Sequence, residues 1–179
     1  MKINLDWSAP ILPGISIMGL SLGVSRREVL EALLSNKIEG GDVDGRAVVQ
    51  FANSPKFVIE QSPDAIVLCD LASRAPESSN LDELFVLGFK DDVLVHLMSS
   101  LIYGASLEYY KGRIFDEVGF GTPISALTKY CEIEFDSGDE LFYSNDSQCM
   151  GLSIGGSCSS LEDDPDQTVS YIRVFKTKE

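Results

Sequence analysis

Residues 112–156 read GRIFDEVGFGTPISALTKYCEIEFDSGDELFYSNDSQCMGLSIGG, and this stretch decides how the rest of the chain is interpreted. Thr122 is a good N-cap, and Pro123 suits the first helical position, so the sequence predicts a short helix there. Three short runs typical of strands follow, EIEFD at 132–136, ELFYS at 140–144 and MGLSI at 150–154. The stretch therefore predicts a helix followed by an antiparallel meander.

A similar unit lies earlier in the chain. Ser25 and Glu28 have the spacing of a capping box, and apolar residues then recur at helical spacing, which predicts a helix over residues 25–36. Asn36 and the pair Gly40-Gly41 are interpreted as its end. From Arg46 onward, β-branched and aromatic runs alternate with turn residues, a pattern typical of an antiparallel meander.

The two units share a local motif. GLSLGVSRREVLEAL and DEVGFGTPISALTKY both place an apolar-glycine step just before a helix start. This similarity predicts a tandem helix-then-meander duplication. The alternative is that a glycine before an N-cap is simply a common way to enter a helix.

We therefore predict an α+β fold, with antiparallel sheet and two short helices in two halves that form one compact unit. The first half is placed at residues 1–104 and the second at residues 105–179. Residues 2–5 are interpreted as a short first strand, residues 72–80 as an exposed loop and residues 101–110 as a connector.

The charge of the chain is strongly acidic. It has 14 Lys plus Arg against 28 Asp plus Glu, a net charge of −14. Such a field repels nucleic-acid phosphates and anionic membranes, and it favours encounter with basic partners. The first residues lack the apolar core of a signal peptide, and no later stretch approaches the roughly 20 apolar residues of a membrane-spanning helix. We therefore expect a cytoplasmic protein that binds neither nucleic acid nor membrane.

Metal binding and catalysis receive little support from the sequence. The single histidine is His96, and no CxxC pair is present, so a zinc site would need scattered ligands. The cysteines are interpreted as free thiols in a reducing compartment; they are Cys69, Cys131, Cys149 and Cys158. His96 lies in the strand-like run VLVHLMSS, where it is expected to face solvent or the second face of the sheet.

No nucleophile elbow, zincin, P-loop or Rossmann motif is present, so we expect neither an enzyme nor a cofactor. The carboxylates of residues 136–140 and 162–166 are of the kind that hold calcium. Neither run has the order of ligands found in an EF-hand, and solvated loop charge is the preferred interpretation.

Acidic residues concentrate between Lys129 and Arg173, where the sequence contains no Lys or Arg. Interfaces commonly use aromatic side chains for binding energy and charges for steering, so this segment is a candidate for partner binding. In the run 140–144, Phe142 and Tyr143 point to opposite faces, so one of them belongs to the core. The predicted partner-binding residues are Asp136, Asp139, Glu140, Tyr143, Asp146, Glu162, Asp163, Asp164 and Asp166.

The runs YKGRIFDEVGFGTPISAL, EIEFDSGDELFYS and VSYIRVF, with a glycine-rich strand between the last two, resemble immunity partners of bacterial polymorphic and contact-delivered toxins. The helix-then-meander duplication is similar to the architecture of β-lactamase inhibitor proteins, which are secreted and disulfide-bonded. The resemblance covers residues 105–175, with a weaker echo over residues 14–99. Its motifs are glycine, turn and apolar features, so no functional residue is transferred from it.

The resemblance implies a cytoplasmic inhibitor that binds a cognate toxin domain and occludes its active site. Toxin domains that attack nucleic acids are usually basic, which agrees with the acidic charge of this chain. The alternative is an acidic protein-binding or scaffold module, for example a phage or accessory factor, without a toxin partner. The oligomeric state stays open.

Overall fold

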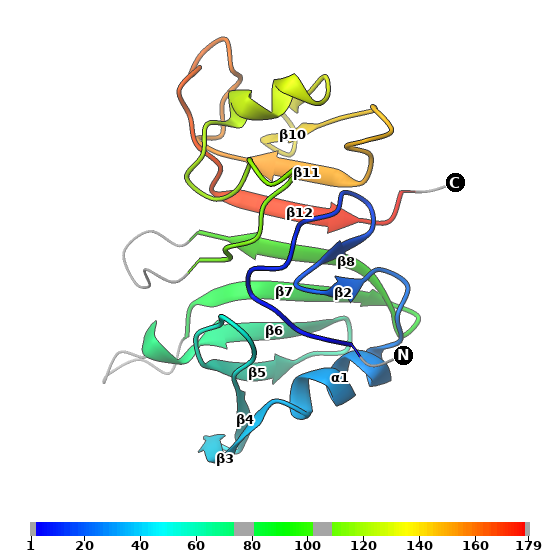
Figure 1. The fold of residues 1–179 in the computed structure, drawn as a ribbon, viewed down its shortest axis with the longest axis vertical. Helices are drawn as coiled ribbons and strands as arrows, with labels where there is room; N and C mark the ends of the chain where they lie inside the picture. Colours follow the sequence, from blue (N-terminus) through cyan, green and yellow to red (C-terminus); the bar gives the residue numbers. More distant parts are fainter. Residues whose placement is uncertain (1–2, 74–80, 102–108, 178–179) are drawn as a thin grey trace.

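The structure is a computed structural model that describes residues 3–73, 81–101 and 109–177. Its main element is one antiparallel sheet with the strand order β3-β4-β5-β6-β7-β8-β12-β11-β10-β9 (Figure 1). The ten strands of the sheet are β3 (Lys37–Val43), β4 (Arg46–Val49), β5 (Phe57–Gln61), β6 (Ala65–Asp70), β7 (Glu83–Lys90), β8 (Val93–Ser100), β9 (Glu134–Asp136), β10 (Leu141–Tyr143), β11 (Leu152–Gly155) and β12 (Tyr171–Phe175). The remaining elements are the hairpin of β1 (Ser16–Ile17) and β2 (Leu20–Ser21), helix α1 (Arg26–Leu34), and the 3-10 helices η1 (Leu71–Ser73) and η2 (Ile124–Lys129).

Two consecutive meanders build the large sheet. Strands β3 to β8 each pair with the next strand along the chain, and so do β9 to β12. The meanders are joined by their last strands, since β12 pairs with β8 and places Tyr171 opposite Ser100 and Phe175 opposite His96. The prediction of an α+β protein with mostly antiparallel sheet and two short helices is confirmed in this coarse form.

Helix α1 begins as its sequence predicts. The Glu28 amide donates to Ser25 Oγ at 3.3 Å, and the Ser25 amide donates to Glu28 Oε2 at 2.9 Å, so both halves of the capping box are present. Val29 and Leu33 lie on the buried side of the helix. The helix ends at Leu34, near the predicted end at residue 36.

The second helix differs from its prediction. Thr122 does not cap it, because its hydroxyl bonds to the backbone of Gly119 instead. The Ile124 amide donates to Gln167 O at 3.1 Å, so the first turn is held by the strand-like segment before β12. The result is the short 3-10 helix η2, with Pro123 at the N-cap position.

Two other local predictions are wrong. Residues 37–43 form strand β3, although Gly40-Gly41 was interpreted as the end of a helix. Residues 3–5 are not a strand; the chain makes only an isolated bridge between Asp6 and Ala52. Most of the predicted loop at 72–80 and of the connector at 101–110 lies outside the described residues.

One face of the sheet is covered by the N-terminal segment, the β1-β2 hairpin, α1 and the segment that leads to η2 (Figure 1). Trp7 is fully buried at the centre of this layer, and its indole N–H donates to Tyr109 O at 3.0 Å. Its ring contacts four other aromatic rings, those of Phe51, Phe57, Phe85 and Tyr110. We call this side of the sheet the covered face.

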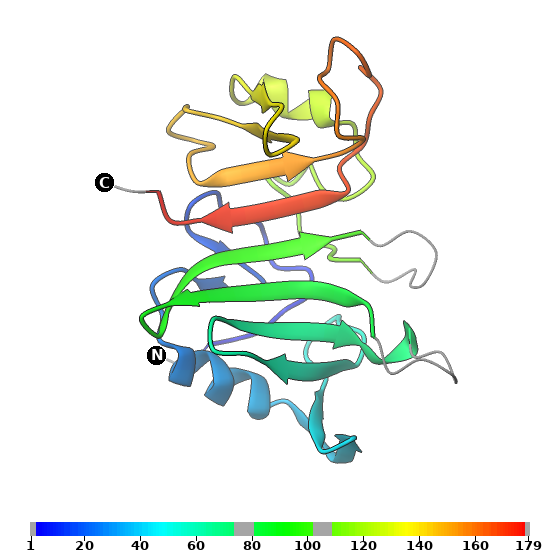
Figure 2. The same ribbon diagram turned by 180° about the vertical axis from the view of Figure 1, so that it is seen from behind.

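Figure 2 shows the other side, where no described segment crosses β7, β8, β12 or β11. We call this side the open face. Burial along β12 separates the two faces, because Ile172 and Val174 are fully buried, whereas Tyr171, Arg173 and Phe175 are partly exposed. In the pairs formed by β7, β8, β12 and β11, residues opposite each other point to the same face, so the same two faces continue across the centre of the sheet.

A disulfide joins Cys131 to Cys149, whose Cα atoms lie 6.4 Å apart. The expectation of four free thiols is therefore wrong for these two residues. The turn after η2 and the loop before β11 bring them together, which a separation of 18 residues in the sequence does not reveal. Cys69 is free and buried, and Cys158 is free and exposed. Within the described ranges, no helix combines the length and the apolar character needed to span a membrane.

Candidate protein-binding face

A single row of side chains runs across the open face, one from each of eight neighbouring strands. In an antiparallel pair, residues directly opposite each other point to the same face, so the register defines this row. In sheet order from β5 to β9, the row consists of Glu60, Val67, Val86, Met98, Arg173, Ser153, Tyr143 and Glu134. The row is acidic at both ends and cationic at its centre.

Apolar and aromatic side chains surround the centre of the row. The neighbouring positions on the same face add His96 and Phe175 on one side, and Tyr171 and Leu141 on the other. We define the central patch as Arg173 with the partly exposed residues Val67, Val86, His96, Met98, Leu141, Tyr143, Tyr171 and Phe175. An open face of an antiparallel sheet is usually polar, so this composition calls for a separate explanation.

The aromatic rings of the patch hold Arg173 in place. Its guanidinium carbon lies 5.3 Å from the ring centroid of Phe175, within cation–π range. The ring of Tyr143 meets that of Phe175 edge-on, with centroids 6.3 Å apart. Tyrosine, phenylalanine, methionine and arginine are the residue types enriched in interface cores.

Two polar atoms at the centre of the patch are not satisfied. Arg173 Nε is buried, and among the described residues it has no hydrogen-bond partner. Ser153 is fully buried directly opposite Arg173 on β11, and its Oγ likewise has no partner within the described ranges. Buried polar groups are nearly always paired, so each such atom needs an explanation.

His96 lies on the open face, one of the two positions that its sequence context predicted. Its imidazole covers Gly88 on β7, where an added Cβ would come within 1.9 Å of the ring. Burial, together with the charge of Arg173, lowers the pKa of His96. The imidazole is therefore neutral near pH 7, next to a permanent cation.

The predicted acidic surface adjoins the central patch at the turn between β9 and β10. Tyr143 lies in the patch, and its hydroxyl donates to Asp139 Oδ2 at 2.7 Å. Burial and this hydrogen bond raise the pKa of Tyr143 to about 12. Asp136 Oδ1 accepts from the amides of Gly138 at 2.7 Å and Asp139 at 3.3 Å, so its carboxylate closes the turn.

The second part of the predicted surface, the loop at residues 157–166, meets this turn. A hydrogen bond to Glu140 raises the pKa of the Cys158 thiol, which places the two segments in contact. Asp163 accepts from the Ser160 hydroxyl at 2.8 Å, and Asp164 accepts from the Ser157 hydroxyl at 2.6 Å. These two carboxylates therefore also hold the loop together.

The remaining predicted residues are more dispersed. Glu162 and Asp166 are exposed on the loop. Asp146 lies beyond the opposite end of β10, where its Oδ2 accepts from the Glu132 amide at 2.7 Å. The structure thus brings the turn 136–140 and the loop 157–166 together and places Asp146 apart from them.

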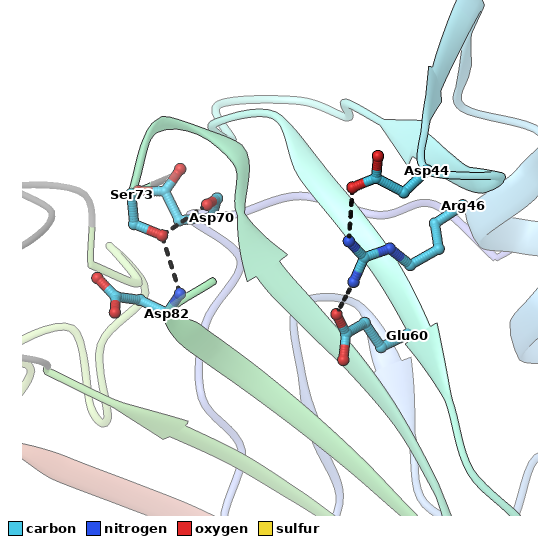
Figure 3. Close-up of polar contacts among 6 residues, drawn as sticks. All are labelled: Asp44, Arg46, Glu60, Asp70, Ser73 and Asp82. Atoms are coloured by element: carbon cyan, nitrogen blue, oxygen red, sulfur yellow. Dashed lines mark hydrogen bonds and ion pairs between the residues drawn. The ribbon is translucent and has the colours of Figure 1, made fainter. Parts of the chain in front are cut away.

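A second group of polar contacts lies in the first meander, on and beside β4, β5 and β6 (Figure 3). Arg46 forms ion pairs with Asp44 and Glu60, beside a hollow of about 540 Å³. Nearby, the fully buried Asp70 accepts from the Ala72 amide at 2.9 Å, and its Oδ2 has no partner among the described residues. In those ranges, no three His, Cys, Asp or Glu side chains are gathered so that they could hold a metal ion.

Sequence reasoning missed the centre of the patch. The alternation in residues 169–175 put Tyr171, Arg173 and Phe175 on one face. It did not indicate that this face is open, because that depends on where the N-terminal segment packs. Comparisons with protein-family models, curated proteins and solved structures gave no match.

Proposed function

We propose that this protein is an immunity-type inhibitor that binds a cognate bacterial toxin domain through the open face of its sheet. The observation that carries the proposal is the central patch, a group of partly exposed aromatic and aliphatic side chains around Arg173, whose Nε has no hydrogen-bond partner among the described residues. Such a patch costs solubility on a free surface, and contiguous exposed apolar surface is typical of interaction sites. Aromatic residues and arginine are also the side chains that dominate binding energy at interfaces.

The position of the patch favours tight binding. Its residues come from β6, β7, β8, β10 and β12, each hydrogen-bonded to a strand on both sides. A surface on paired strands is already ordered before binding, so association costs little conformational entropy. Preorganised inhibitors of this kind change their backbone little on binding.

The acidic charge supports a basic partner. Glu134 and Glu60 end the central row, and Asp136, Asp139 and Glu140 extend the acidic rim beside β10. Rim charges accelerate encounter with an oppositely charged protein more than they strengthen the final complex. A basic toxin domain is therefore the partner that this surface fits, and cytoplasmic neutralisation of such a toxin is part of the proposal.

We also propose that the two halves are tandem structural repeats. The Gly23 amide donates to Leu94 O at 2.8 Å, and the Leu94 amide donates to Val24 O at 2.9 Å. In the second half, the Gly121 amide donates to Val169 O at 2.9 Å, and the Val169 amide donates to Thr122 O at 2.9 Å. Both glycines have positive φ, at 89° and 76°.

The register of the central strands supports the same repeat. Met98 lies four residues after Leu94, and Arg173 lies four residues after Val169, so the two positions are equivalent. Met98 and Arg173 are also directly opposite each other in the β8-β12 pair. A local two-fold axis between equivalent strands requires such a pair. The central patch would then sit on the axis that relates the halves.

The proposal is tested by co-expression with candidate toxin domains, starting with any that is encoded next to the gene of this protein. We expect growth to be rescued and a stable complex to elute from gel filtration. A charge placed in the patch, Phe175→Asp, should abolish both effects, whereas the triple variant Asp163→Asn, Asp164→Asn, Asp166→Asn should slow association and keep the complex. Absence of both rescue and complex with the unaltered protein would overturn the proposal and favour a binding module without a toxin partner.

A further inference from the structure

We propose that Arg173 and Ser153 form an anchor site for a carboxylate, into which the partner protein inserts an aspartate or glutamate side chain. The inference rests on the proposed function, because it names the chemistry at the centre of the same surface. It also makes the surface bipolar, with a cationic centre inside an acidic rim. The expected partner therefore presents one acidic side chain surrounded by basic ones.

The anchor site has two polar groups on the same face of the sheet that lack partners among the described residues. Arg173 Nε is buried, and no described residue accepts a hydrogen bond from it. Ser153 Oγ, on the directly opposite residue, is also buried and has no hydrogen-bond partner within the described ranges. A guanidinium and a hydroxyl together match the two oxygens of a carboxylate, and hydrogen bonds to charged groups are the strong ones.

Within the described ranges, the carboxylates near the patch do not fill the site. Glu134 and Glu60 stand three and four strands away from Arg173 along the central row, about 14 Å and about 19 Å at normal strand spacing. Glu60 is already paired with Arg46. Asp139 is the acidic residue linked to the patch, and it is occupied by the Tyr143 hydroxyl. Among the acidic residues that the structure describes, this arrangement leaves the central cation available to an external anion.

The surroundings of Arg173 strengthen such a bond. Phe175 contacts the guanidinium, Met98 lies directly opposite Arg173 on β8, and Tyr143 lies two strands away on β10, beyond Ser153. A partner that covers these apolar groups would remove water from the ion pair, and charge–charge attraction is much stronger where the dielectric is low. The acidic rim disfavours a polyphosphate chain, so a carboxylate on a protein surface fits better than nucleic acid.

The anchor site can be tested with the purified full-length protein and two small probes of the same shape. The probes are 3-phenylpropionate and its uncharged amide, titrated while the Arg173 Nε–H resonance and the ring protons of Phe175 are followed by NMR. We expect the carboxylate to give saturable shifts at these positions and the amide to give none. Ser153→Ala should weaken binding of the carboxylate by about 3- to 10-fold, and Arg173→Met should abolish it.

Several outcomes would overturn the anchor site. These are equal shifts with both probes, shifts that persist in Arg173→Met, or tighter binding of inorganic phosphate than of the carboxylate. Circular dichroism and thermal melting of Arg173→Met and Arg173→Gln would verify that both variants fold. If neither folds, pH titration of the bound probe decides, since binding must disappear as the carboxylate is protonated.

The failure of the anchor site and the failure of the proposed function are distinguishable. If the toxin domain binds the unaltered protein and Arg173→Met equally well, the anchor site is wrong and the immunity function stands. If the carboxylate probe binds at Arg173 but no toxin domain is neutralised, the anchor site stands and the partner is of another class.

Discussion

The covered and open faces of the sheet are built from the same strands, but their apolar side chains differ in burial. On β7, Phe85 is fully buried under Trp7, while its neighbour Val86 points to the open face and stays partly exposed. On β12, Ile172 is fully buried, while Arg173 and Phe175 face solvent. Alternation along each strand thus separates a packing surface from a surface that has no covering layer among the described residues.

The difference teaches that apolar character alone does not identify the core of this protein. On the covered face, burial of aromatic side chains supplies stability, because removal of apolar area from water drives folding. On the open face, similar side chains remain partly in water and contribute less. Binding is the role that we propose for them, and substitutions on the two faces should therefore separate stability from binding.

The largest expected effect is on the covered face. Phe85→Ala should lower the free energy of unfolding by about 3–5 kcal/mol, because the lost ring leaves a cavity beside Trp7 and Tyr110. The matched control is Val86→Ala, the next residue in the chain, which should cost under about 1 kcal/mol. Urea unfolding measures both. Equal losses would break the distinction between the faces.

Loss of the disulfide should have the second-largest effect on stability. Cys131 and Cys149 belong to the buried core of the protein, next to the 3-10 helix η2, which stands in place of a full α-helix. Replacing both by alanine should cost about 3 kcal/mol, as expected for a cross-link that closes a loop of this length. Thermal unfolding with and without reductant measures it. The double variant should no longer respond to reductant, and a variant that still responds would assign the effect to another thiol.

The third effect concerns close packing on the open face. Gly88→Ala should cost about 1–3 kcal/mol, because the added methyl group meets the imidazole of His96. His96→Ala should remove the clash, so the double variant is expected to be more stable than the sum of the single effects implies. A double-mutant cycle measured by urea unfolding tests this. Additive losses would show that the backbone, and not the imidazole, limits this position.

A smaller effect should appear with pH. The pKa of His96 is lowered in the folded protein, so the unfolded chain binds a proton more readily. Stability from the neutral imidazole is complete above the unfolded pKa of about 6.5 and is lost as the pH falls through the folded pKa. The unaltered protein should therefore lose more stability than His96→Gln between pH 7 and pH 5. Parallel curves for the two proteins would contradict this.

Local rules predicted most of the secondary structure. The capping box of Ser25 and Glu28 was predicted from the sequence, and the strand-like run VLVHLMSS coincides with β8. The prediction that Thr122 caps the second helix was wrong. The start of this helix is held by the segment before β12, a long-range contact that local rules do not reveal. The Cys131–Cys149 disulfide was missed for the same reason.

The candidate site was predicted only at its edge. Tyr143 and the buried Phe142 were correctly predicted to point to opposite faces of the sheet, because alternation along a strand is a local property. The centre of the patch was not predicted, since β8 and β12 are far apart in the sequence and meet only through the joining of the two meanders. An acidic run is visible in the sequence, whereas a single arginine such as Arg173 becomes informative only when its neighbours in space are known.

The smallest change in stability is expected for Arg173→Met, and this substitution distinguishes the roles of the two faces most clearly. Arg173→Met keeps an unbranched apolar stem against Phe175 and removes a guanidinium whose Nε is buried and has no hydrogen-bond partner among the described residues. An unsatisfied buried polar group is destabilising, so this substitution should leave the free energy of unfolding within about 0.5 kcal/mol or increase it. Binding of the partner should nevertheless fall, because the cation at the centre of the patch is gone.

Urea unfolding and gel filtration with the toxin domain, carried out on the same preparation of Arg173→Met, test both statements. Arg27→Met on helix α1 is the matched control, since Arg27 is a highly exposed arginine whose ion pair with Glu31 lies at the surface. It should change neither stability nor binding appreciably. A large loss of stability in Arg173→Met would mean that the arginine supports the fold, and the open face would then resemble the covered face in its role.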